Sequence, residues 1–181
     1  MAAGTRQIVL LRGINVGRNK QVPMPRLKEV LTGLGYGDVR THLRSGNVLL
    51  TSGAKAEKLE RDLEKQIAAE FGFEVRVLTR SRDEIADVVE RSPLGHVADN
   101  GSRYHVSFLS AEPGTEVVSE LSAADVAPDQ IVFSGREIYI WLPGGTQQSA
   151  ALKLLTEKRL GVTATVRNWN TVTKLLALAG G

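Results

Sequence analysis

The stretch VRTHLRSGNVLLT (residues 39–51) decides the fold of the first half of the chain. Its first six residues alternate between an apolar and a cationic set: Val39, Thr41 and Leu43 against Arg40, His42 and Arg44. That period is typical of a strand with one face toward a core. The centre, Ser45-Gly46-Asn47, is typical of a tight turn, so Val48–Thr51 is predicted to return as the second strand of an antiparallel hairpin.

Elements on both sides of this hairpin complete a recognisable order. A buried strand at Ile8–Leu11 and a helix from Met24 to Leu34 are predicted before it. A helix over Leu59–Phe71, ended by Gly72, and a strand around Val75–Val77 are predicted after it. The resulting order, strand-helix-strand-strand-helix-strand (βαββαβ), is that of a ferredoxin-like subdomain.

The second half repeats the order of elements without a repeat of sequence. Its predicted strands and helices are Tyr104–Leu109, Val117–Leu121, Ile131–Phe133, Ile138–Leu142, Ala150–Arg159 and Thr163–Val166, followed by an appended helix at Val172–Leu178. We therefore predict an α+β chain of two ferredoxin-like (βαββαβ) subdomains with antiparallel sheets and an appended C-terminal helix. The predicted boundaries are 1–80 for the N-terminal subdomain, 81–102 for a linking helix and loop, and 103–181 for the C-terminal subdomain with its helix.

Composition excludes several classes of protein and site. The chain has 181 residues and no cysteine, which excludes disulfides, thiolate catalysis and cysteine-ligated zinc. The apolar run near the N-terminus is far shorter than a signal peptide or a membrane span, so we expect a soluble, cytoplasmic protein with no membrane partner. Residues 1–80 hold 14 Lys and Arg against 8 Asp and Glu, whereas residues 81–181 hold 9 against 12. This asymmetry indicates an anion-facing first half, unless solvated charges are scattered by chance.

The loop RGINVGRNK (residues 12–20), between the first strand and the first helix, is the leading candidate site. Successive backbone N–H groups in a glycine-containing turn can form an anion-binding nest, and basic side chains add charge. The arginines would pair with the anion, the glycines would permit close approach, and the asparagines would orient it. The predicted ligand-binding residues of the first half are Arg12, Gly13, Asn15, Gly17, Arg18 and Asn47. The alternative is a structural loop whose asparagines satisfy their own backbone.

A second cluster of Arg, Asn and Trp lies near the other end, in RNWNT (residues 167–171). We predict that Arg167 and Asn168 return toward the first loop, at the cleft between the subdomains, and complete the same ligand site. The alternative is structural: Asn168 or Asn170 caps the last helix, and Trp169 seals the core.

Short motifs spread along the chain carry a resemblance to a known family. They are RGINVG (residues 12–17), Val22-Pro23-Met24, Leu34-Gly35 and Ser45-Gly46-Asn47-Val48 in the first half, and Ser134-Gly135-Arg136, Trp141-Leu142-Pro143-Gly144, Leu160-Gly161 and Thr165–Thr171 in the second. With these motifs the chain resembles DUF1697, a bacterial family classed as a domain of unknown function. The resemblance implies an α+β protein with two ferredoxin-like halves and no established activity. Arg18 stands where the family usually has a second glycine, which makes the loop more cationic.

The sequence offers no recognisable catalytic set, cofactor fingerprint or metal site. The three histidines, His42, His96 and His105, are best explained as satisfied surface side chains. The loop also lacks the spacing of a Walker phosphate-binding loop or a dinucleotide fingerprint. We therefore expect a small anionic or phosphorylated ligand, with no cofactor and no metal. Catalysis and oligomeric state are left open.

The alternative function is a nucleic-acid or ribonucleoprotein-associated binding module that uses the basic first half. Its cationic surface would be the open side of the first sheet, lined by Arg40, His42, Arg44, Arg76 and Arg80. No aromatic residue lies on the first three predicted strands, so base stacking is disfavoured and attraction to phosphates remains. A third possibility, an enzyme without cofactor, would use Arg and Asn side chains for electrostatic stabilisation but lacks an identifiable base.

Overall fold

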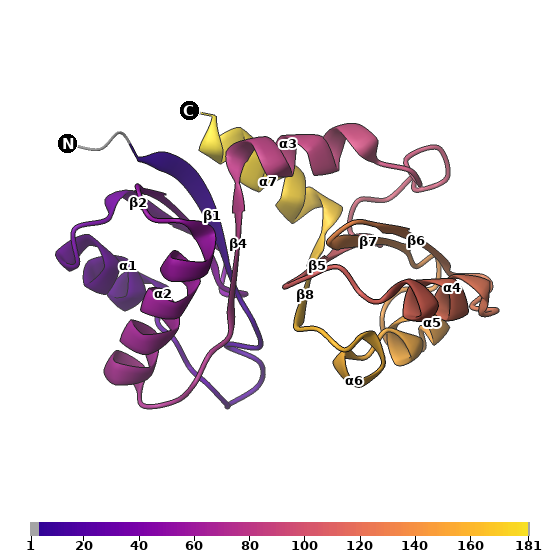
Figure 1. The fold of residues 1–181 in the computed structure, drawn as a ribbon, viewed down its shortest axis with the longest axis horizontal. Coiled ribbons are helices and arrows are strands. Elements are labelled where there is room, and N and C mark those ends of the chain that lie inside the picture. Colours follow the sequence, from indigo (N-terminus) through magenta and orange to yellow (C-terminus); the bar gives the residue numbers. More distant parts are fainter. Residues whose placement is uncertain (1–3, 181) are drawn as a thin grey trace. The chain divides into compact units, whose positions relative to one another are not determined.

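The structure, a computed structural model, describes residues 4–180 (Figure 1). Contacts between Cα atoms divide the chain into two compact units. The first unit holds the residues up to Ala86 together with those from Lys174 onward, and the second holds Asp87–Thr173. The predicted boundaries at residues 80 and 103 do not coincide with this division. The end of the C-terminal helix belongs to the first unit, where a Cβ added to Gly180 would lie 3.6 Å from Arg82 Nε.

The first unit contains a four-stranded antiparallel sheet with the strand order β2-β3-β1-β4. Its elements are β1 (Thr5–Leu11), α1 (Met24–Gly33), β2 (Gly37–His42), β3 (Asn47–Ser52), α2 (Ala56–Phe71) and β4 (Val77–Ser81). Both helices lie on the same side of the sheet (Figure 1) and bury their apolar stripes against alternate strand residues such as Val9. In α2 the buried stripe is Leu59, Leu63 and Ile67, and Gly72 ends the helix with a left-handed φ of 80°.

The hairpin of residues 39–51 forms as predicted, with two corrections at its turn. β2 ends at His42, so Leu43 does not extend the apolar face; it has a φ of 61° and is 55% exposed. Asn47 is not a turn residue but the first residue of β3, and it is fully buried. Its Nδ2 donates to the carbonyl oxygen of His42 at 2.8 Å, which closes the turn and leaves Leu43 outside the ladder.

The second unit contains a four-stranded antiparallel sheet with the strand order β6-β7-β5-β8. Its elements are β5 (Tyr104–Leu109), α4 (Thr115–Ala123), β6 (Gln130–Ser134), β7 (Glu137–Trp141), α5 (Ala150–Leu154), α6 (Glu157–Leu160) and β8 (Ala164–Asn168). The single helix predicted over residues 150–159 is wrong, because two short helices stand there. Leu155 leaves the helical conformation, and Thr156 caps α6 by accepting a hydrogen bond from Arg159 N at 3.4 Å.

The order of elements in each unit is compatible with the predicted ferredoxin-like arrangement, and the repeat extends one helix further. β4 runs directly into α3 (Arg82–Arg91), and β8 runs directly into α7 (Trp169–Ala179). Ser81 and Glu84 form a capping box at α3: Ser81 N donates to Glu84 Oε2 at 2.7 Å, and Glu84 N donates to Ser81 Oγ at 3.1 Å. The C-terminal helix is therefore not an unmatched addition, since α3 is its counterpart.

Candidate ligand-binding site

The loop of residues 12–20 is built from left-handed backbone. Gly13 and Gly17 have φ values of 66° and 60°, and the non-glycine residues Asn15 and Lys20 have 54° and 46°. An antiparallel bridge joins Val16 to Asn19, so the tip of the loop is a tight turn. Asn15 N closes its base by donating to the carbonyl oxygen of Lys20 at 3.0 Å. Non-glycine residues seldom adopt positive φ unless the surrounding structure holds them there.

The side chain of Asn15 holds this loop in place. Its Nδ2 donates to the carbonyl oxygens of Val22 at 3.0 Å and Arg44 at 2.7 Å, and its Oδ1 accepts from Val22 N at 2.8 Å. An amide group has two hydrogens to donate, and both are used here. The geometry therefore gives Asn15 the backbone-satisfying role considered as the alternative, and its effect on a ligand acts through the position of Arg44.

The loop and the hairpin turn meet, although the fold alone did not require them to be neighbours. Leu11 N donates to the carbonyl oxygen of Gly46 at 2.8 Å. A Cβ added to Gly46 would lie 2.8 Å from both Ile14 Cδ1 and Leu11 Cβ, so the close approach needs glycine. Asn47 braces the turn from inside, since its Nδ2 also donates to Ser45 Oγ at 3.1 Å. Asn47 is thus a buried support of the turn rather than part of its surface.

A cavity of about 320 Å³ lies beside this junction. It is lined by Asn15, Gln21, Val22, Pro23, Met24, Pro25 and Arg44. Arg44 Nη2 donates to Gln21 Oε1 at 3.4 Å, a long hydrogen bond that holds the guanidinium loosely. The first turn of α1 carries no acidic residue, and its N-cap, Pro23, makes no side-chain capping bond. The positive end of the helix dipole is therefore not compensated locally by a side-chain charge or cap.

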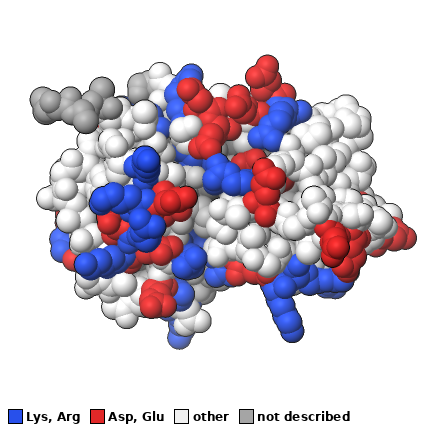
Figure 2. All heavy atoms as spheres, viewed as in Figure 1, with Lys and Arg blue, Asp and Glu red and all other residues white. Residues whose placement is uncertain are grey.

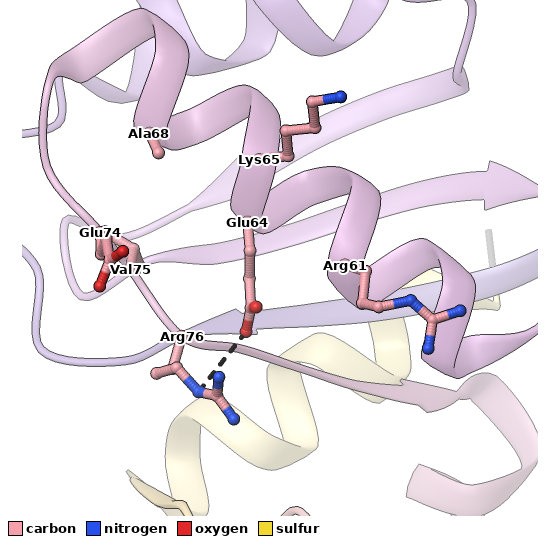
Figure 3. A pocket seen from close by; sticks show the side chains of 7 residues that line it. All are labelled: Arg61, Glu64, Lys65, Ala68, Glu74, Val75 and Arg76. Carbon is pink, nitrogen blue, oxygen red and sulfur yellow. Dashed lines mark ion pairs between the residues drawn. The ribbon is translucent and has the colours of Figure 1, made fainter.

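The predicted cations of the loop differ in their surroundings. Arg18, at the tip, is exposed, whereas Arg12 is half-buried and its backbone N donates to the carbonyl oxygen of Arg76 at 3.0 Å. Lys20 Nζ donates to the carbonyl oxygen of Glu74 at 2.9 Å. Glu74 and Arg76 line a second cavity of about 310 Å³ against α2, with Arg61, Glu64, Lys65, Ala68 and Val75 (Figure 3). There Arg76 Nε lies 3.7 Å from Glu64 Oε1, so acidic groups balance part of the positive charge.

Arg167 and Asn168 lie in the second unit, in structural positions. Arg167 is 6% exposed, and its Nη1 donates to Thr165 Oγ1 at 2.7 Å and to the carbonyl oxygen of Val166 at 3.0 Å. Burial lowers the pKa of Arg167 to about 10. Asn168 Oδ1 caps α7 by accepting from Thr171 N at 3.0 Å. Trp169 stacks on Tyr104 with ring centroids 4.6 Å apart.

Several side chains were placed differently by the sequence. Arg80, predicted on an open cationic face, is 1% exposed, and its Nη1 donates to the carbonyl oxygen of Thr79 at 2.9 Å. His105, predicted as a surface side chain, is 8% exposed. The sequence interpretation also left Gln21 and Arg44 out of the predicted ligand set. The signal available was Val22-Pro23-Met24-Pro25, a helix start without a Ser, Thr, Asp or Asn cap.

Two searches of residues 4–180 bear on the class of site. No group of three or more His, Cys, Asp or Glu side chains in this range could hold a metal ion. No helix in the same range is long and apolar enough to cross a membrane.

Comparisons with known proteins place the chain among uncharacterised ones. No curated protein matches it. A conserved bacterial protein of solved structure, SP0830 from Streptococcus pneumoniae, is 24% identical with a TM-score of 0.80, over 99% of this chain and 100% of that chain, and so shares the fold. An unknown protein from Galdieria sulphuraria is 14% identical with a TM-score of 0.26, over 92% of this chain and 98% of that chain, a likeness too low to carry an argument. A family model described as a protein of unknown function (DUF1697) matches residues 5–139, more than half of the chain, and the chain therefore belongs to this family, as its motifs predicted.

Proposed function

We propose that the first unit binds a small anionic or phosphorylated ligand in the cavity between the loop of residues 12–20, the hairpin turn and the start of α1. The observation that carries the proposal is the position of Arg44. Its guanidinium lines a cavity of about 320 Å³ whose wall includes Pro23 and Met24, the N-terminal end of α1. A guanidinium and the positive end of a helix dipole at one cavity favour an anion with several acceptor oxygens.

Each neighbouring residue then has a role that its contacts support. Arg44 pairs with the anion, and Gln21 holds its guanidinium at the cavity wall when no anion is bound. Arg12 and Arg18 add positive potential at the rim, and Gly13 and Gly17 let the loop turn tightly beside the ligand. Asn15 and Asn47 act as supports of the loop and the turn. A contribution from Arg167 and Asn168 stays a prediction, as does the ferredoxin-like assignment of the two units.

The nucleic-acid alternative receives less support. Arg80 is buried, Arg40 Nε lies 3.2 Å from Asp38 Oδ1, and Arg76 is paired with Glu64. Basic and acidic side chains are interspersed on the visible face of the first unit (Figure 2). A nucleic-acid surface needs several unopposed cations in a row to release counterions.

Thermal unfolding in the presence of phosphate-containing probes tests the proposal. Inorganic phosphate, pyrophosphate and a set of sugar and nucleoside phosphates are added to the protein, and a binder is expected to raise the melting temperature by a few degrees at about 10 to 100 times its Kd. Arg44→Ala should lose this response. Arg40→Ala removes an exposed arginine of the same hairpin that is already paired with Asp38, and it should keep the response.

Three outcomes would contradict the proposal. They are no response to any probe, an equal loss in both variants, or a response that falls steeply with added salt. A steep dependence would indicate release of many counterions and therefore the nucleic-acid alternative, whereas one small anion gives a shallow slope.

A further inference from the structure

β6 is an edge strand of the second sheet with no feature that discourages pairing. Its sequence, Gln130-Ile131-Val132-Phe133-Ser134, contains no charge and no proline. All five residues pair in regular register with β7, from Gln130 opposite Trp141 to Ser134 opposite Glu137. Ile131 through Ser134 are half-buried, and β7 is the only strand beside β6 in its sheet. A regular apolar edge of this kind is a template for another strand.

The short turn after β6 fixes which backbone groups face outward. Two residues, Gly135 and Arg136, join β6 to β7, so Ser134 and Glu137 form a hydrogen-bonded pair. Alternation along the ladder then points the N–H and C=O groups of Ile131 and Phe133 away from β7. Within the described residues, no other element donates to or accepts from these groups.

The other three sheet edges carry obstacles to pairing. On β4, the outward N–H groups of Val77 and Thr79 donate to Glu64 Oε1 at 2.9 Å and Glu60 Oε1 at 2.7 Å. On β8, Ala164 N donates to Glu157 Oε1 at 2.8 Å. On β2, the register shifts between Gly37 and Arg40, and both Asp38 and Arg40 are charged. β6 stands apart because it has none of these three devices.

We propose that β6 pairs antiparallel with β6 of a second copy of this chain, across a two-fold axis at Val132. In this register Ile131 of each copy lies opposite Phe133 of the other, and the outward groups of both residues form four hydrogen bonds. The pairing joins two four-stranded sheets into one of eight strands.

Side chains and charge support a second copy as the occupant. Ile131 and Phe133 pack as half-buried members of the core cluster of the second unit. Their cross-strand pairing combines a β-branched and an aromatic side chain twice, a favourable combination in sheets. The same register sets Arg136 of one copy beside residues 125–129 of the other, which carry the carboxylates of Asp125 and Asp129. The edge is thus complementary to itself in hydrogen bonding, apolar surface and charge.

A five-residue strand pair is a small interface, so we expect a reversible dimer with a Kd on the order of 0.1 mM. Sedimentation or light scattering across a concentration series should show a mass that rises from monomer to dimer. Val132→Lys places two lysines opposite each other at the axis and should leave a folded monomer, as judged by circular dichroism. A wild-type protein that remains monomeric at about 1 mM overturns the proposal.

Single cysteines test the register, because the chain has no cysteine of its own. The two-fold axis makes Val132 a non-hydrogen-bonded pair with its own copy, with Cα atoms about 4.5 Å apart, a distance that a disulfide spans. Val132→Cys should therefore form a covalent dimer on mild oxidation, and a reducing agent should reverse it. Gln130→Cys, exposed and on the same strand, would stand four residues out of register, roughly 13 Å from its copy, and should remain monomeric. No cross-link at position 132, or equal cross-linking at 130 and 132, overturns the proposed pairing, even where Val132→Lys fails to fold.

Discussion

Asn15 combines left-handed backbone with three side-chain hydrogen bonds, and this combination defines its role. Its partners are the backbone of Val22 and Arg44, which lie 7 and 29 residues away in the chain. Residue type and polar density were enough to locate the loop from the sequence. They could not assign the work of Asn15, because Arg44 is brought to it by the folding of a separate hairpin. Arg44 itself was assigned to a strand face for the same reason.

Replacing Asn15 by Asp separates the hydrogen bonds from the backbone conformation. Aspartate tolerates left-handed φ and keeps an acceptor for Val22 N, but it cannot donate to the carbonyl oxygens of Val22 and Arg44. We expect the free energy of unfolding, measured by urea titration at neutral pH, to fall by about 2 kcal/mol. Asn19→Asp, at the exposed loop tip, should change it by less than about 0.5 kcal/mol. Similar losses in the two variants would show that charge, not lost donors, is responsible.

Two histidines sit in surroundings that disfavour their charged forms. His105 lies on β5, burial lowers its pKa, and within residues 4–180 its buried Nδ1 has no hydrogen-bond partner. Burial lowers the pKa of His42, and the charge of Lys174 lowers it further. Alternation along a strand identified both positions, but it gives no measure of how deeply a polar side chain is buried.

These shifts set the direction of a pH dependence. The unfolded chain binds protons at His42 and His105 more readily than the folded chain does. The free energy of unfolding should therefore fall as the pH drops below about 6.5, the ordinary histidine pKa, and should not depend on these groups above it. Urea titrations between about pH 8 and pH 5 measure this fall. His105→Gln should be less sensitive to pH, and His96→Gln, in an exposed loop, should keep the full sensitivity. A rise in stability on acidification would contradict the prediction.

At the scale of elements, α2 serves the sheet with its polar side as well as its apolar stripe. Glu60 and Glu64 stand one turn apart on the helix and accept hydrogen bonds from alternate N–H groups of the edge strand β4. Thr79 Oγ1 also donates to Glu60 Oε1 at 2.9 Å. The 3.6-residue period predicted the buried stripe of α2 and left its glutamates as a solvated face. Their partners lie on a strand that helical periodicity does not describe.

Glu60→Ala tests the value of this contact. The substitution leaves Thr79 N and Thr79 Oγ1 without their acceptor, and Thr79 is 1% exposed. We expect a loss of about 2 kcal/mol in the free energy of unfolding and faster hydrogen exchange at the Thr79 amide. Glu57→Ala, an exposed position in the first turn of the same helix, is the matched control and should cost less than about 0.5 kcal/mol. Unchanged exchange at Thr79 would mean that water replaces the carboxylate without loss.

At the scale of the whole molecule, the two units share a plan that their sequences do not show. In each, a last strand with a buried arginine, Arg80 or Arg167, passes directly into a capped helix. In both strands Nη1 of that arginine donates to the carbonyl oxygen of the preceding residue. Hydrophobic periods predicted the order of strands and helices in both halves. They did not predict that α3 and α7 correspond, because one helix was interpreted as a link and the other as an appendage.

The division of the chain into units was harder to predict for a related reason. Contiguous boundaries at residues 80 and 103 assume that each subdomain is one segment of sequence. The contacts instead return the residues from Lys174 onward to the first unit, through the last turns of a helix that begins in the second. Helical periodicity identifies the apolar stripe of α7, with Leu175 buried, but it does not identify the element that the stripe contacts.

A titration of His42 tests whether the end of α7 belongs to the first unit in solution. The charge of Lys174, 132 positions away in sequence, lowers the pKa of His42 in addition to the effect of burial. Lys174→Ala should therefore raise the pKa of His42, followed by nuclear magnetic resonance, while burial keeps it below the ordinary value. Added salt should reduce the difference between wild type and variant, since a partly exposed pair is screened. Lys158→Ala removes a lysine of α6 in the second unit and should leave the His42 titration unchanged. If Lys174→Ala also leaves it unchanged at low salt, the last turns of α7 do not stand beside β2, and the first unit ends within α3.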